Sequence, residues 1–137
     1  MSKIHDILFN HIRYISQVFL LEYILVTDYH SFHGAQDHCI SINRTLMEPK
    51  TQQALDDTFE LRRQDSNYFW LGGSDEVTEG TWLWLSDGSP IDLTQFWAED
   101  RPNRIGFHQD YLCVSYWEPP KLLDCADASL PFICEAP

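Results

Sequence analysis

The sequence predicts an α+β fold, with two helices in the first half of the chain and short strands in the second. Apolar residues recur at helical spacing before Asn67, whereas short apolar runs separated by Gly, Pro, Asp and Trp follow it. The 137 residues are 44% hydrophobic and 22% charged, a composition that supports a packed core and excludes a disordered chain. Because no repeat or linker divides the chain, we expect one domain over residues 21–137, preceded by an extension over residues 1–20.

The N-terminal extension is predicted to be either an amphipathic helix or an atypical start. Ile4, Leu8 and Ile12 recur at helical spacing. Charged residues such as Arg13 and Glu22 interrupt the apolar stretch, which argues against both a secretory signal and a membrane-spanning helix. We therefore expect no membrane span, and we hypothesise that these residues are not the natural start of a secreted chain.

A strand and two helices are expected before Asn67. Tyr23 to Val26 is an apolar, β-branched run typical of a strand. Ser31 suits a helix N-cap because its hydroxyl can accept from the free amides of the first turn. The second helix should begin near Pro49, whose missing N–H costs little there, and end near Arg62, whose charge suits a helix C-terminus. The residues expected on the buried faces are Phe32, Ala35, Cys39 and Ile42 in the first helix, and Leu55, Phe59 and Leu61 in the second.

Short strands are expected after Asn67, together with a tight turn at Asp87 and Gly88. Glycine accepts a positive φ without steric cost, so an Asp-Gly pair favours a turn. The strands are expected at residues 69–71, 81–85, 111–116 and 131–134.

Four cysteines, Cys39, Cys113, Cys125 and Cys134, permit three disulfide pairings. A zinc site is the alternative, but the chain has no Cys-x-x-Cys and its first cysteine is far from the others. Disulfides favour an oxidising compartment, so we expect a secreted or extracellular protein. Asn43 begins an Asn-Arg-Thr triplet and is a candidate glycosylation site.

The charge balance excludes several classes of function. Nine basic and 21 acidic residues give a formal charge of −12, which argues against nucleic acid and anionic membrane surfaces as partners. No Gly-x-Ser-x-Gly element or phosphate-binding loop occurs, so we expect no enzyme activity. His30, His33 and His38 could hold zinc, although polar residues on an exposed helix face are the simpler interpretation.

Four motifs follow one another between Tyr23 and Glu135. They read SFHGAQDHC at residues 31–39, FWLGG at 69–73, EGTWLWLSDG at 79–88 and PFICE at 131–135. In this order, with the four cysteines, they resemble the C-type lectin-like domain. Phe32 stands where the family's first helix has Trp. The resemblance implies the C-type lectin-like fold, with two helices packed on short antiparallel sheets, a long loop region and two disulfides.

The resemblance also implies how the cysteines pair. Cys39 would join Cys134 and Cys113 would join Cys125, which is the short form of the domain. The first bridge closes a long loop and stabilises the fold by about 4–5 kcal/mol in the chain-entropy account. The family motifs place Trp70, Trp82 and Trp84 in the core, whereas Trp97 and Trp117 remain open between packing and ligand contact.

Lectins of this family bind sugar through calcium, and the resemblance implies where its ligands stand. The family supplies them from a Glu-Pro-Asn or Gln-Pro-Asp triplet, a loop acid and a Trp-Asn-Asp triplet. This chain has Arg101-Pro102-Asn103 at the first triplet and Leu122-Leu123-Asp124 at the last. The candidate calcium ligands are Asn103, Gln109, Asp110 and Asp124, and the candidate ligand-binding residues are Arg101, Asn103, Asp110, Asp124 and Trp97.

Arg101 departs from the family pattern, because a guanidinium has only donors and a permanent positive charge. Three alternatives remain open. Arg101 takes the place of the cation and pairs with Asp124 or Asp110; it points into solvent; or a shifted register uses Glu99 or Asp100 as a ligand. We therefore expect carbohydrate binding with weak or altered calcium dependence. The alternative is a calcium-independent module that recognises a protein or a surface and has lost sugar binding.

Overall fold

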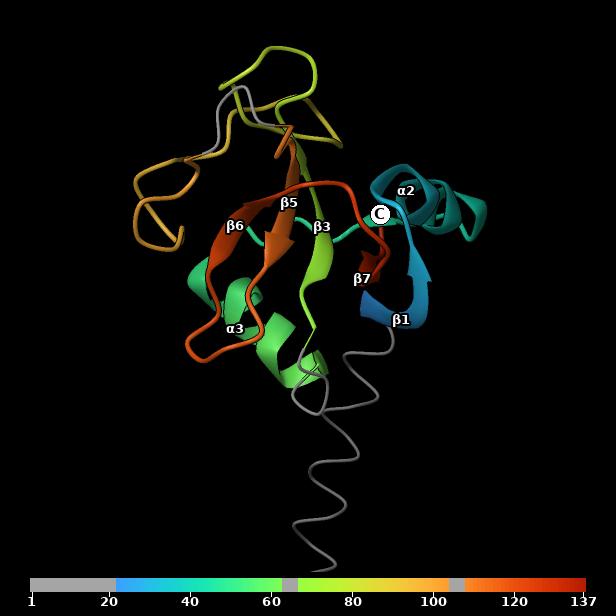
Figure 1. Ribbon diagram of the computed structural model, residues 1–137. Coiled ribbons are helices and arrows are strands. Elements are labelled where there is room, and N and C mark those ends of the chain that lie inside the picture. Colours follow the sequence, from blue (N-terminus) through green and yellow to red (C-terminus); the bar gives the residue numbers. More distant parts are fainter. Residues whose placement is uncertain (1–21, 63–66, 104–107) are drawn as a thin grey trace, which may run out of the picture.

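The computed structural model describes residues 22–62, 67–103 and 108–137, so the predicted extension over residues 1–20 lies outside the described part. Within these ranges the chain forms the helices α2 (Phe32–Ser41) and α3 (Gln52–Arg62) and seven strands (Figure 1). The strands are β1 (Tyr23–His30), β2 (Thr45–Leu46), β3 (Phe69–Ser74), β4 (Leu83–Trp84), β5 (Tyr111–Val114), β6 (Leu122–Cys125) and β7 (Leu130–Glu135). The predicted α+β class is confirmed.

The described strands form one mixed sheet in the order β1-β7-β3-β5-β6. Strand β2 pairs with β7, and β4 pairs with β3. Neighbouring strands are antiparallel except β3 and β7, which run parallel with Trp70 opposite Phe132. The short antiparallel pairings that the resemblance implies are present, and one parallel pair is added because the last strand returns to the middle of the sheet beside β3.

The two helices pack on opposite faces of this sheet, as the alternation of buried residues along the strands shows. Trp70 and Phe132 belong to the core cluster that includes Phe32 of α2. Phe69 and Ile133, each one residue away along its strand, belong to the cluster that includes Leu55 of α3. Successive strand residues point to opposite faces, so α2 and α3 each cover one of them.

The predicted cap of the first helix is confirmed, but one expected core residue is wrong. The Ser31 hydroxyl accepts from the amide of Gly34 at 3.1 Å. Ile42 is exposed, because the helix ends at Ser41 and Ile42 is already its C-cap residue. The second helix begins at Gln52 rather than near Pro49, since the hydroxyl of Thr51 accepts from a first-turn amide at 3.1 Å.

The predicted strands occur with shifted ends, and two strands were not expected. β3 extends to Ser74, whereas β5 stops at Val114 because the next residue, Ser115, begins the turn to β6. β2 is only two residues long, too short to give a periodic pattern. β6 was missed because its Leu-Leu-Asp-Cys sequence places a buried Asp124 inside a strand.

Both disulfides that the resemblance implies are present in the described part of the chain, Cys39 with Cys134 and Cys113 with Cys125. The first joins α2 to β7, and the second joins β5 to β6. Gly88 has a φ of 70°, as the predicted turn requires. No helix among the described residues is long and apolar enough to cross a membrane.

Candidate functional site

Two groups of charged side chains lie at one end of the sheet, where β3 and β6 end and β5 begins. The register places Ser74 opposite Tyr111, and Tyr111 opposite Cys125. The residues next to these positions therefore meet at the same edge. One group is the acidic cluster, defined as Asp75, Glu79 and Asp110, and the other is the pair of Arg101 with Asp124.

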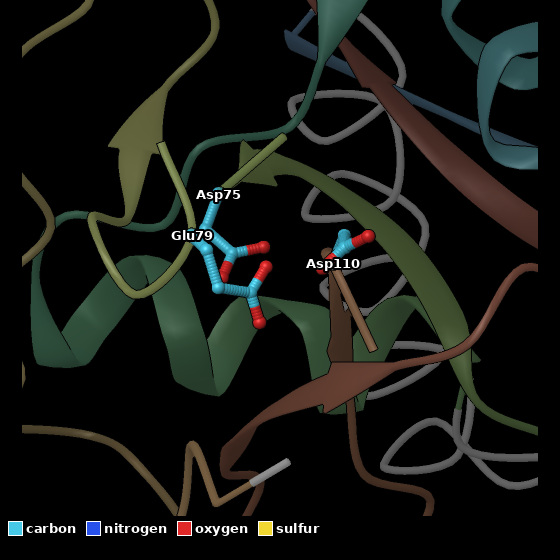
Figure 2. A group of neighbouring side chains, drawn as sticks. All are labelled: Asp75, Glu79 and Asp110. Carbon is cyan, nitrogen blue, oxygen red and sulfur yellow. The ribbon is translucent and has the colours of Figure 1, made fainter. Parts of the chain in front are cut away.

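The acidic cluster joins two segments that are far apart in the sequence. Asp75 and Glu79 belong to the turn after β3, and Asp110 directly precedes β5 (Figure 2). The amide of Asp75 donates to the backbone oxygen of Asp110 at 3.1 Å, which fixes the segments side by side. The turn is closed by the amide of Gly80, which donates to Asp75 Oδ2 at 2.9 Å. One oxygen from each of the three carboxylates lies within 4.8 Å of the others.

Two oxygens of the acidic cluster have no hydrogen-bond donor among the residues that the structure describes. Asp75 Oδ1 and Asp110 Oδ1 are buried and unpartnered, and the Asp75 residue is only 2% exposed. Burial raises the pKa of Asp75 to about 6, and the neighbouring Asp110 and Glu79 add to this increase. A buried carboxylate oxygen without a donor is costly, so this cluster is destabilising in its fully ionised form.

The donor set of the acidic cluster fits a calcium ion. Calcium takes six to eight oxygen ligands and prefers carboxylates. The three side chains bring carboxylate oxygens together, and the two unpartnered oxygens would gain a partner that the described protein atoms do not supply. The three carboxylates can therefore supply part of a calcium coordination shell.

The second group shows the opposite arrangement, because Arg101 supplies the cation. Its Nη1 donates to the backbone oxygen of Asp124 at 2.8 Å and to the carboxylate Oδ1 of the same residue. The other carboxylate oxygen, Oδ2, accepts from the amide of Asn103 at 3.3 Å. Asp124 is 1% exposed, whereas the Arg101 side chain is 26% exposed. Both oxygens of this buried carboxylate thus already have donors.

Of the three alternatives for Arg101, the structure shows the pairing with Asp124. The peptide bond between Arg101 and Pro102 is cis. Gln109 adds a longer contact, from its Nε2 to the Asp124 backbone oxygen at 3.5 Å. The candidate calcium ligands are therefore divided: Asp124 is bound by Arg101, while Asp110 faces Asp75 and Glu79.

Trp97 is placed in the core. It is 9% exposed and packs edge to face on Trp82 with the ring centroids 5.3 Å apart. Its indole nitrogen donates to the backbone oxygen of Asp92 at 3.0 Å. Of the two interpretations left open by the sequence, these contacts support packing. Asn43, the candidate glycosylation site, is exposed in the turn after α2.

A histidine from α2 contacts the turn that carries the acidic cluster. His33 Nε2 lies 3.0 Å from Glu76 Oε2, and the Tyr111 hydroxyl donates to the same oxygen at 3.0 Å. The contact with Glu76 raises the pKa of His33. Among the described residues, no histidine belongs to a group of three that could hold a metal ion, so the zinc hypothesis gains no geometric support.

The sequence reasoning missed Asp75 and Glu79 as candidate ligands. In the sequence Glu79 belongs to the EGTWLWLSDG motif, and Asp75 lies between this motif and FWLGG. A signal was available, because the acids Asp75, Glu76 and Glu79 directly follow a buried strand. Because β3 and β5 are antiparallel, side chains just after the end of β3 lie beside those at the start of β5.

Comparisons with known proteins agree on one family. Residues 28–136 match the lectin C-type domain family. A hepatic lectin from Gallus gallus is 28% identical over 108 residues, which cover 78% of this chain and 50% of the relative. The chain thus spans half the length of that relative.

Solved structures share the fold. C-type lectin CEL-I from Cucumaria echinata superposes with a TM-score of 0.73 at 21% identity, covering 82% of this chain and 87% of that one. A calcium-independent type II antifreeze protein gives a TM-score of 0.69 at 20% identity, with coverages of 82% and 83%. At these identities the likeness shows the fold alone.

Proposed function

We infer the function of this chain from its family, because the chain belongs to the lectin C-type domain family over residues 28–136. We propose that it is a non-enzymatic extracellular recognition domain that binds carbohydrate with altered calcium dependence. The observation that carries this proposal is the contrast between the buried Asp124, which Arg101 neutralises, and the acidic cluster, in which two buried oxygens have no donor among the described residues.

Among the described residues, the acidic cluster offers calcium a better ligand set than the surroundings of Arg101 do. An ion next to Asp124 would have to compete with a guanidinium that already bonds to that carboxylate. In the acidic cluster an ion would instead relieve the repulsion between Asp75 and Asp110. Calcium bound there would hold the turn after β3 against the start of β5, where it stabilises the loops rather than contacting sugar directly.

Sugar is contacted by side chains that are accessible to solvent, namely Arg101 and its neighbour Asn103. The Asn103 side chain is exposed and the Arg101 side chain is partly exposed, and both can hydrogen-bond to sugar hydroxyls. Asp124 is buried and bonds to Arg101 and to the Asn103 amide, so its role is to position these groups, whereas Trp97 packs in the core. Asp110 links the acidic cluster to the Arg101–Asp124 pair. It belongs to the cluster, and it directly follows Gln109, which contacts Asp124.

A glycan array tests this proposal when it is run with calcium and with chelator on two proteins, the original chain and Asn103→Ala. The backbone amide of Asn103 is unchanged by this substitution, so its bond to Asp124 should persist. We expect sugar signals that chelator reduces without abolishing and that Asn103→Ala weakens. Signals that vanish completely with chelator would contradict indirect calcium action.

A second function is favoured by the same ion pair. Because Arg101 holds the loop through Asp124, this part of the domain needs no metal to keep its shape. The alternative is therefore a calcium-independent module that binds a protein or a surface. An array with no sugar signal under either condition would favour this alternative over carbohydrate binding. The exposed Asn43 and the two disulfides support an extracellular location for either function.

A further inference from the structure

The turn between β5 and β6 carries exposed aromatic side chains at the end of the sheet opposite the acidic cluster. Asp110 precedes β5 and the turn follows it, so the strand separates the two sites. Tyr116 is 46% exposed and Trp117 is 39% exposed. Their ring centroids are 5.6 Å apart, and the ring of Tyr68 lies 5.3 Å from that of Tyr116. These three rings form a single cluster that solvent can reach.

A hollow of about 350 Å³ lies beside this turn, between the turn and α3. Figure 1 shows the turn, coloured orange, next to α3. Phe59, Pro119 and Pro120 give the hollow an apolar lining. Its volume is within the range of roughly 300–1,000 Å³ that is usual for ligand pockets.

Carboxylates from two elements surround this apolar lining. Asp56, Asp57 and Glu60 belong to α3, and Glu118 belongs to the turn. None of the described residues that line the hollow is basic. Asp56 and Asp57 each accept from a neutral glutamine amide at 2.9 Å. Burial raises the pKa of Asp57, and Asp56 and Glu60 contribute to the increase, so a cation entering the hollow would be stabilised there.

We propose that this aromatic–acidic surface, defined as the rings of Tyr68, Tyr116 and Trp117 together with the hollow, binds a segment of a protein partner that carries arginine or lysine. The carboxylates pair with the cationic group, and the exposed rings attract it through their π faces. The apolar lining accepts the aliphatic stem of a long basic side chain. The recognised chemistry is thus a cation at the end of an apolar chain.

This inference goes beyond the proposed carbohydrate binding, because it concerns another end of the molecule and needs no calcium. A second copy of this chain is a poor occupant, since two chains of net charge −12 repel each other. Anionic ligands are opposed by the same carboxylates. A basic protein segment is the occupant that complements both the charge and the shape of the surface.

The test uses the oxidised full chain, with chelator present, and fluorescein-labelled octapeptides as probes. One probe alternates glycine with arginine, and the other replaces arginine by citrulline, which has the same shape without the charge. Fluorescence anisotropy should show binding of the arginine peptide that weakens with salt, and little binding of the citrulline peptide. Glu118→Gln and Trp117→Ala should each weaken the binding by about two- to five-fold.

The matched control is the double variant Asp28→Asn and Asp37→Asn, compared with the double variant Asp56→Asn and Glu118→Gln. Both change the net charge equally, but Asp28 and Asp37 are exposed residues of β1 and α2. Near-ultraviolet circular dichroism confirms that each variant is folded. Equal weakening in both double variants would overturn the proposal, because binding would then follow total charge. Displacement of the labelled peptide by free arginine at equal concentration would also overturn it, since the site would then bind small amines.

Discussion

The acidic cluster and the Arg101–Asp124 pair lie at the same end of the sheet, but the buried carboxylate in each is compensated differently. At Asp124 the chain supplies its own cation, and both carboxylate oxygens have donors. At Asp75 it supplies one backbone amide, and the other oxygen has no partner in the described part of the chain. The comparison teaches that nearby donors decide whether a buried carboxylate is compensated, which the net charge of −12 does not reveal.

Breaking the Arg101–Asp124 pair should have the largest effect on the free energy of unfolding. Arg101→Met leaves Asp124 buried without its cation, and we expect the free energy of unfolding to fall by about 3 kcal/mol. Urea denaturation at pH 7 with chelator measures it. The double variant Arg101→Met with Asp124→Asn should recover most of the loss, because the buried charge is then absent. A loss below about 0.5 kcal/mol would mean that the pair behaves like an exposed ion pair.

The opposite result is expected at the acidic cluster. Without calcium at pH 7.5, Asp75→Asn should raise the free energy of unfolding by about 1–3 kcal/mol, because it removes a buried charge while keeping an acceptor for Gly80. Calcium should stabilise the original chain and not the variant, and calorimetry should show an affinity for calcium at least about ten-fold lower in the variant. Asp28→Asn, at an exposed position, is the control and should leave both quantities unchanged.

The advantage of Asp75→Asn should depend on pH with a defined sign. The folded pKa of Asp75 is raised from 3.8 to about 6, so the stabilising contribution of its protonated form is complete below 3.8 and is lost as the pH rises through about 6. The difference between the variant and the original chain should therefore shrink as the pH falls from 7.5 toward 4. Constancy of this difference over that range would contradict the raised pKa.

The smallest effect should appear at His33, which touches the same turn from α2. Its contact with Glu76 raises its pKa, so an NMR titration of the imidazole should give a midpoint above the usual value near 6.5. Glu76→Gln should lower this midpoint, with little change in stability because both side chains are substantially exposed. An unchanged midpoint in this variant would show that Glu76 is not the cause.

Most of the fold could be predicted because local pattern and packing agree. Ser31 is an N-cap by its chemistry, and Phe32, Ala35 and Cys39 share one helix face. The missed elements are those in which local pattern is weak or contradicted. Strand β2 was missed because its two residues are too few to show the alternation of apolar and polar residues that indicates a strand. The buried Asp124 in β6 is tolerated only because Arg101, distant in sequence, supplies its cation.

The candidate site could be predicted only in part, because its geometry depends on strand register. The sequence indicated that Arg101 could pair with Asp124 or Asp110, and the structure shows the first of these pairs. The sequence alone could not indicate that Asp110 faces Asp75 and Glu79, because that contact depends on the pairing of β3 with β5. Gln109 and Asp110 are adjacent in sequence, yet Gln109 contacts Asp124 and Asp110 belongs to the acidic cluster.

The bridge between Cys39 and Cys134 has a mechanical consequence. The two cysteines are 95 residues apart in sequence but are covalently joined near both ends of the domain. A pulling force on the chain ends would pass along β1 and α2 to Cys39, cross the bridge and leave through the end of β7. The segment between them, including the acidic cluster and the Arg101–Asp124 pair, would carry no load. A domain held under tension between two surfaces would therefore keep these two groups in their resting geometry.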